Sequence, residues 1–200
     1  GSVMGTAILA TLLQTLAGPP GSLAAAGLLA VAWALLLALA VAFVRRCARD
    51  RGALPASVAT PVAAAQWGMV SMGLLAVGSA TTTVIGARVP DGPWWAVGVV
   101  LWVVGTALGF ATGVGFAARL VRRDPGEPTT VWGLAVVPPM VTATTGAALV
   151  PHVGAAGPVV LGVSAAGFAV ALCLGSIVFG MAYHHHWRVA PVPVVASASS

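Results

Sequence analysis

The stretch LAAAGLLAVAWALLLALAVAFV, residues 23–44, decides the fold of this chain. It runs for 22 residues without a charged side chain, and its one polar group is the indole N–H of Trp33. About 20 apolar helical residues are enough to cross the roughly 30 Å hydrocarbon core of a bilayer. A helix satisfies its backbone hydrogen bonds internally, which an open strand in lipid cannot do. We therefore predict a membrane-spanning helix here.

The composition extends this prediction to the whole chain. Of its 200 residues, 59% are hydrophobic and only 6% are charged, and the mean hydropathy is +1.01. A soluble domain carries about 25% charged residues, so most of this surface is not built for water. Nine arginines and four acidic residues also cannot form the basic face of a nucleic-acid-binding protein. The expected partner is a lipid bilayer, and no nucleic acid is expected.

Six candidate spans are separated by stretches rich in proline, glycine or arginine. They cover residues 3–17, 22–44, 62–86, 94–119, 129–150 and 157–187. Period-two alternation typical of barrel strands is absent, so the predicted fold class is all-α, a polytopic membrane helical bundle. We expect one transmembrane domain over residues 1–188 and a polar tail or truncated loop over 189–200. Because the first span is short and begins in apolar sequence, the chain is expected to start inside a helix.

Arginine positions test the number of spans independently. Cytoplasmic loops of membrane proteins retain an excess of positive charge. With six spans, eight of the nine arginines fall on one side, and only Arg88 falls on the other. The eight are Arg45, Arg46, Arg49, Arg51, Arg119, Arg122, Arg123 and Arg188. We therefore predict a multi-pass protein of the cell membrane with a cytoplasmic N-terminus.

Polar residues distinguish the odd-numbered spans from the even-numbered ones. The first, third and fifth spans contain most of the hydroxyl and amide side chains, whereas residues 23–44 contain none. A helix that lines a pore or cavity gathers such groups, and a helix that faces lipid does not need them. We infer that odd helices are inner and pore-lining and that even helices are outer. The alternative is that each hydroxyl bonds to its own helix backbone, as serine and threonine readily do in membranes.

Pro138 and Pro139 lie in the middle of the fifth span. Each removes an amide donor and leaves a carbonyl about four residues earlier without its partner, near Leu134 and Ala135. Hydroxyls, a neighbouring helix or water in a pore could satisfy these carbonyls. The two prolines should also kink the helix. This kink is either a pore feature or only a packing feature. In the fourth span, glycines four residues apart at 105, 109 and 113 predict close helix packing.

Acid–base and metal chemistry find little support in the sequence. No ionisable side chain lies in the core of a predicted span, and the acidic residues all lie in loops. His184, His185 and His186 are consecutive and so cannot all reach one metal ion. We predict no cofactor, no metal, no catalytic residue, and free thiols at Cys47 and Cys173. A pathway of hydroxyls and backbone groups without carboxylates would not repel anions, and without buried arginine it would bind them weakly.

Two segments resemble one family of membrane proteins. Residues 3–10, VMGTAILA, resemble the "VMGTGI" opening of the tellurite-resistance/dicarboxylate transporter family. Residues 137–152, VPPMVTATTGAALVPH, resemble the "VPPMVSAATGALLVPH" segment of its bacterial members. The family also contains malate and sulfite exporters and plant slow anion channels.

The resemblance implies a ten-helix, often trimeric protein in which the odd helices surround a pore and the even helices form an outer ring. It implies proline kinks in the inner helices and a phenylalanine on the ninth helix that occludes the pore. This chain corresponds to the first six helices, so that phenylalanine has no counterpart here. We therefore expect either a fragment of a longer chain or a pore completed by a partner.

The predicted function is that of a channel-like transporter or exporter of small anions, of the dicarboxylate, sulfite or tellurite class, and not of an enzyme. The predicted partner is a small inorganic or organic anion, and the assembly that the resemblance implies is a homotrimer. One alternative is a non-transporting membrane subunit or assembly factor, and another is an enzyme with a metal at residues 184–186. The residues predicted to line the pathway are Thr6, Gln66, Ser71, Pro138, Pro139, Thr142 and Thr145.

Overall fold

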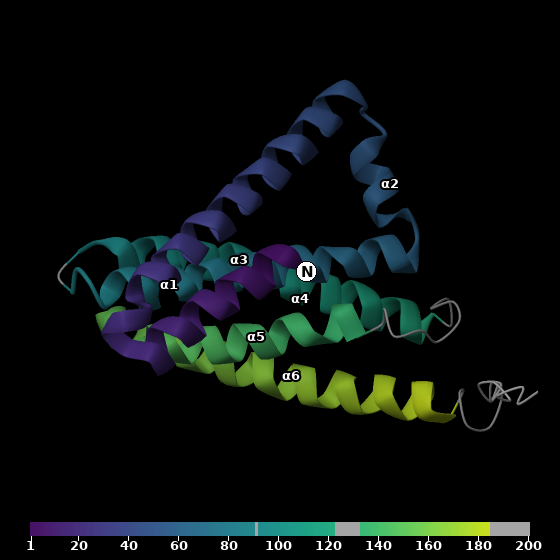
Figure 1. Ribbon diagram of the computed structural model, residues 1–200. Coiled ribbons are helices and arrows are strands. Elements are labelled where there is room, and N and C mark those ends of the chain that lie inside the picture. Colours follow the sequence, from purple (N-terminus) through teal and green to yellow (C-terminus); the bar gives the residue numbers. More distant parts are fainter. Residues whose placement is uncertain (91, 123–132, 185–200) are drawn as a thin grey trace, which may run out of the picture.

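A computed structural model of the chain describes residues 1–90, 92–122 and 133–184 (Figure 1). Five helices in this part of the chain are long and apolar enough to cross a membrane. The fold is an all-α membrane helical bundle, as predicted. Its elements are α1 (Ser2–Arg49), α2 (Ala53–Ala59), α3 (Pro61–Gly86), α4 (Trp94–Val121), α5 (Gly133–Leu149), the 3₁₀ turns η2 (Val150–His152) and η3 (Gly154–Ala156), and α6 (Gly157–His184).

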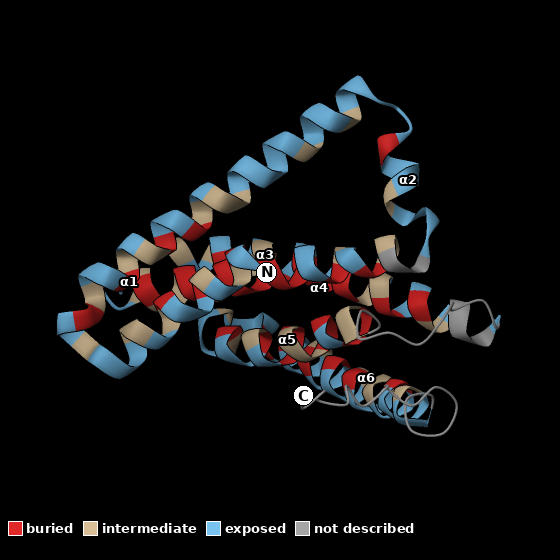
Figure 2. Ribbon diagram, turned by 45° about the vertical axis from the view of Figure 1, so that its right-hand side comes forward, coloured by how far each residue is buried: buried red, intermediate tan, exposed pale blue. Residues whose placement is uncertain are grey.

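The first two predicted spans form one element, α1, which bends sharply at Gly18. Gly18 has φ 58° and ψ −142°, a conformation that side chains disfavour, and the helix resumes at Pro19 and Pro20. Proline fits there because the first helical residues have no use for an intrahelical N–H donor. After the bend, α1 leaves the bundle at an angle and is exposed along most of its second half (Figures 1 and 2).

The connection between α1 and α3 contains a short helix, α2, that the sequence did not indicate. The indole N–H of Trp67 in α3 donates to the hydroxyl of Ser57 in α2 at 3.2 Å. The same indole meets the ring of Phe43 edge to face, with ring centroids 5.4 Å apart. Trp67 therefore holds both α1 and α2 near the start of α3.

The remaining helices lie close to the predicted spans. The spans expected over residues 62–86 and 94–119 correspond to α3 and α4. α5 begins at Gly133 and α6 ends at His184, and residues 129–132 and 185–187 of the last two predicted spans lie outside the described residues. The tail expected over 189–200 also lies outside them.

α3 is the centre of the bundle, because it packs against α1, α4 and α5, while α5 also packs against α4 and α6. In their most apolar stretches, 61% of α3 and 44% of α5 are buried, against 33% of α4 and 22% of α6. Figure 2 shows the buried residues gathered where these helices meet. Of the five long helices, α3 and α5 therefore have both the most hydroxyls per residue and the largest buried fraction, whereas the most apolar stretch of α1 is only 11% buried.

The glycines of α4 allow this close packing, as predicted. A Cβ atom added to Gly105 would lie 2.8 Å from Cγ of Leu75 in α3. At Gly109 it would lie 2.8 Å from the hydroxyl oxygen of Ser71 and 3.0 Å from Cβ of Pro138. Dispersion forces and close backbone approach hold helices together in lipid, where the hydrophobic effect contributes little.

Three connections meet at one end of the bundle: the bend of α1, the α3–α4 connection and the α5–α6 connection (Figure 1). The guanidinium of Arg88 donates to the carbonyl of Ser22, just after the bend. The rings of Trp94 and His152 meet edge to face, with centroids 5.4 Å apart. Arg88, the exception in the arginine pattern, thus lies at this end, while α3 begins and α4 ends at the opposite one.

The bend at Gly18 predicts an asymmetry between two glycines of α1. Gly18→Ala should destabilise the protein by about 1 to 3 kcal/mol, because alanine is strained in this backbone conformation. Gly27→Ala is the control: Gly27 is helical, exposed and has no atom within 4 Å of an added Cβ, so alanine there should be neutral or stabilising. Thermal unfolding in detergent measures both, and equal melting temperatures would contradict the bend.

Candidate functional site

Buried polar side chains form a layer that joins α3, α4 and α5. The hydroxyl of Ser71 in α3 donates to the carbonyl of Gly105 in α4 at 2.7 Å. The hydroxyl of Thr106 in α4 donates to that of Thr142 in α5 at 3.4 Å. The indole N–H of Trp102 donates to the carbonyl of Thr142 at 3.1 Å. All four of the side chains that take part are buried, so we name Ser71, Trp102, Thr106 and Thr142 the polar layer.

The two prolines of α5 lie beside the polar layer and are fully buried. A Cβ added to Gly68 in α3 would lie 3.1 Å from Cγ of Pro138, and one added to Gly113 in α4 would lie 3.9 Å from Cγ of Pro139. Gly167 of α6 faces the carbonyl oxygen of Pro139. Helices α3, α4 and α6 therefore surround the double proline, and α5 continues as one helix through it.

The other three predicted residues are less buried than this layer. Only Thr145 reaches it, through a long hydrogen bond of 3.5 Å from its hydroxyl to the Thr142 carbonyl that also accepts from Trp102. Thr6 and Thr145 are half-buried, and their hydroxyls donate to the carbonyls of Ser2 at 2.9 Å and Val141 at 2.7 Å, each within its own helix. Gln66 is exposed near the start of α3. Of the seven predicted residues, the structure thus brings together four buried ones, Ser71, Pro138, Pro139 and Thr142. The other three keep exposed surface: Thr6 on α1, Gln66 on α3 and Thr145 on α5.

Most hydroxyls in the described helices donate to a carbonyl of their own helix. The alternative stated from the sequence, that serine and threonine bond to their own backbone, is therefore right for most of them. They occur in odd and even spans alike: Thr6, Thr11, Thr15, Thr81, Thr82, Thr112, Thr144, Thr145, Ser164 and Ser176. A hydroxyl has one proton to donate. To stabilise an anion, such a hydroxyl must first rotate away from its carbonyl, which makes it a weak anion partner.

Sequence reasoning missed the contribution of α4 to the polar layer. Trp102 and Thr106 are four residues apart and so share one helix face, which was the available signal. Gly146 of α5 makes room for the indole, since an added Cβ would lie 2.8 Å from its Nε1 atom. The match between a glycine on one helix and an indole on another cannot be seen in either helix alone.

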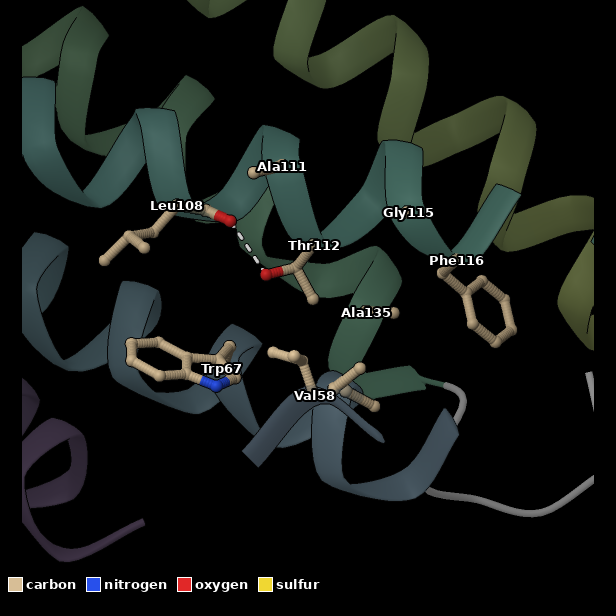
Figure 3. A pocket seen from close by; sticks show the side chains of 10 residues that line it. Val58, Trp67, Leu108, Ala111, Thr112, Gly115, Phe116 and Ala135 are labelled. Carbon is tan, nitrogen blue, oxygen red and sulfur yellow. Dashed lines mark hydrogen bonds between the residues drawn. The ribbon is translucent and has the colours of Figure 1, made fainter. Parts of the chain in front are cut away.

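Two grooves lie between helices of the described part of the chain. The first has a volume of about 370 Å³ and is lined by α2, α3, α4 and Ala135 of α5, with residues such as Trp67 and Phe116 (Figure 3). Its hydroxyl at Thr112 donates to the carbonyl of Leu108 at 2.8 Å. The second, of about 400 Å³ between α4 and α6, reaches Pro139. These apolar surfaces offer few donors to an anion, and Pro139 is the one predicted residue that lines either of them.

Metal-binding groups do not gather in the described residues. Among residues 1–90, 92–122 and 133–184, no three His, Cys, Asp or Glu side chains could hold a metal ion. His184 ends α6, and His185 and His186 lie outside the described residues. Cys47 and Cys173 are free thiols, as predicted.

The polar layer predicts that one tryptophan of α4 matters more than another. Trp102→Phe should destabilise the protein by about 0.5 to 2 kcal/mol, because it removes the hydrogen bond to Thr142 and leaves space beside Gly146. Trp95→Phe is the matched control, since Trp95 lies exposed on the same helix. Melting temperatures in detergent measure both variants, and an equal loss in the two would argue against the layer.

Comparison with known proteins places this architecture in a family. The family model of the voltage-dependent anion channel, SLAC1, matches residues 1–198. Comparisons with curated proteins and with solved structures found no match. The match covers nearly the whole chain and confirms the family resemblance of residues 3–10 and 137–152. The chain belongs to the SLAC1 family of voltage-dependent anion channels.

Proposed function

We propose that this chain forms part of a pathway that carries a small anion out of the cell, with the first half of α1, α3 and α5 as its walls. The family indicates an anion channel or transporter in general. The observation that carries the proposal is the placement of α3, which packs against both α1 and α5 and so brings the three hydroxyl-bearing segments together.

The charge pattern supports an anion as the permeating species. Within the described helices, α3 and α5 have no charged residue, α1 has none before Arg45, and the histidine of α6 is its last residue. No fixed negative charge therefore repels an anion inside the bundle. The three helices of the proposed pathway carry no arginine before Arg45 of α1, so an anion between them would be held only by dipoles and would leave easily, as conduction requires.

The predicted residues take two roles in this proposal. Thr6, Gln66 and Thr145 retain exposed surface on α1, α3 and α5 and line the pathway. Ser71, Pro138, Pro139 and Thr142 are buried between helices and fix the positions of α3 and α5. The hydroxyls and the Gln66 amide supply partial charges to a desolvated anion. Dicarboxylate, sulfite and tellurite are the anion classes proposed, and a homotrimer is the proposed assembly.

Anion flux into vesicles that contain the full chain tests the proposal. Thr145→Val should lower the flux roughly fivefold, since one hydroxyl contact is worth about 1 kcal/mol in a barrier. Thr112→Val is the matched control: its hydroxyl has the same bond to its own helix, but it lies in the apolar groove of α4. Sulfite, malate and tellurite are measured separately to assign the anion class.

The same flux measurement can also favour a non-transporting subunit. If vesicles with the unaltered chain leak no faster than empty ones, and neither variant changes this, the hydroxyls serve packing alone. One observation favours a non-transporting subunit: most hydroxyls bond to carbonyls of their own helices. If Thr112→Val lowers the flux as much as Thr145→Val, the pathway does not follow α5.

The proposed orientation in the cell membrane predicts how cysteines react. Cys47 lies beside Arg45, Arg46 and Arg49, so it should be cytoplasmic. In a Cys173→Ser variant, a membrane-impermeant maleimide should label Cys47 only after the cells are permeabilised. As the control, a cysteine at the exposed Val89 position, in a variant without Cys47 and Cys173, should react in intact cells. The reverse pattern would place the N-terminus outside.

A further inference from the structure

The double proline of α5 leaves two backbone carbonyls without their usual donors. Residues 138 and 139 have no N–H group, so the carbonyls of Leu134 and Ala135 lose the intrahelical bond that they would accept. In hydrocarbon, an unsatisfied carbonyl costs free energy, so some neighbouring group has to meet it. The structure shows which groups lie against these two oxygens.

Gly68 of α3 lies directly against the carbonyl of Leu134. A Cβ atom added to Gly68 would overlap the Leu134 oxygen and would lie 2.9 Å from the carbonyl carbon and 3.1 Å from Cγ of Pro138. The α-hydrogen that glycine has in place of a side chain therefore points at the oxygen. Such Cα–H···O contacts are weak but recur where helices approach closely. No larger residue could occupy this position without moving α3 or α5.

The second carbonyl has a looser neighbour. A Cβ added to Gly113 of α4 would lie 3.4 Å from the oxygen of Ala135, which is an ordinary van der Waals contact. Alanine would therefore fit at position 113 but not at position 68. Of the two freed carbonyls, only that of Leu134 fixes the distance between α5 and a neighbouring helix.

We propose that Gly68 is a positioning residue of the anion pathway: its contact with the Leu134 carbonyl and the Pro138 ring sets the spacing of α3 and α5. This inference rests on the proposed function, in which α3 and α5 are walls of the pathway. Close-packed interiors transmit strain, so we expect a displacement of α5 at Leu134 to reach Thr145 on the same helix. The width available to an anion then changes even though Gly68 itself does not touch it.

The first test measures the contact without any transport. Gly68→Ala should lower the melting temperature of the full chain in detergent by roughly 2 to 10 °C, whereas Gly113→Ala should change it little. Gly115→Ala is a second control, since no atom lies within 4 Å of its added Cβ. If Gly68→Ala and Gly113→Ala have the same melting temperature, the proposed contact is wrong.

A double-mutant cycle identifies the partner of Gly68. Pro138→Ala restores the N–H donor to Leu134 and removes the ring that faces Gly68, so Gly68→Ala should cost less in that background. The effect of Gly115→Ala should be the same in both backgrounds. Full additivity of Gly68→Ala and Pro138→Ala would overturn the assignment of Leu134 and Pro138 as partners.

The second test measures the size dependence of permeation, which lost stability alone would not change. In vesicles, Gly68→Ala should alter the ratio of malate to sulfite flux at least threefold, and Gly113→Ala should leave it unchanged. An unaltered ratio in both variants would contradict the positioning role. The unaltered chain could conduct no anion while the effects of Gly68→Ala and Pro138→Ala on melting temperature are still non-additive. The proposed function would then be wrong, and the contact between Gly68 and α5 would be correct.

Discussion

The bilayer interior contains no water, so every backbone N–H and C=O of this protein must find its partner inside the protein. This constraint explains why its described spanning segments are helices and why a double proline in α5 has consequences beyond that helix. Pro138 and Pro139 free two carbonyls, and the neighbouring helices must approach closely enough to cover them. The bundle around α5 is arranged for that approach, with Gly68, Gly109 and Gly113 facing the double proline and the residues just before it.

Glycines and a few hydrogen bonds, and not large apolar side chains alone, define how these helices fit together. Lipid is as apolar as leucine, so burying a leucine between helices gains little, whereas a closer backbone approach gains dispersion energy. α3 meets α4 through Gly105 and Ser71, and α4 meets α5 through Trp102 and Thr142. Each interface also contains a glycine, Gly105 between α3 and α4 and Gly146 beside the Trp102 indole between α4 and α5, so the helices have one preferred arrangement instead of many.

This packing limits what the interior can do chemically. The hydroxyls that marked the odd spans in the sequence mostly donate to their own helices, so they are weak ligands for an anion. Such an interior suits a protein of the anion channel family, because a permeating ion must be stabilised without being retained. Helix positions, which set the width of a pathway, then matter more than any single ligand. In the proposed function, the residues that set the spacing of α3 and α5 are therefore as relevant to transport as those proposed to line the pathway.

The sequence by itself determined the fold class, because an uncharged run such as residues 23–44 has one stable form in lipid. It also determined the break between the first two predicted spans, where α1 bends at Gly18, since glycine and proline impose local backbone geometry. Only the tertiary structure decided which polar residues meet. Ser71 turned out to face Gly105, and Trp102 and Thr106 of α4 joined Thr142. The reason is physical: local propensity depends on neighbours in the chain, whereas the rotation and spacing of packed helices depend on contacts such as Gly68 with Leu134, which no single segment encodes.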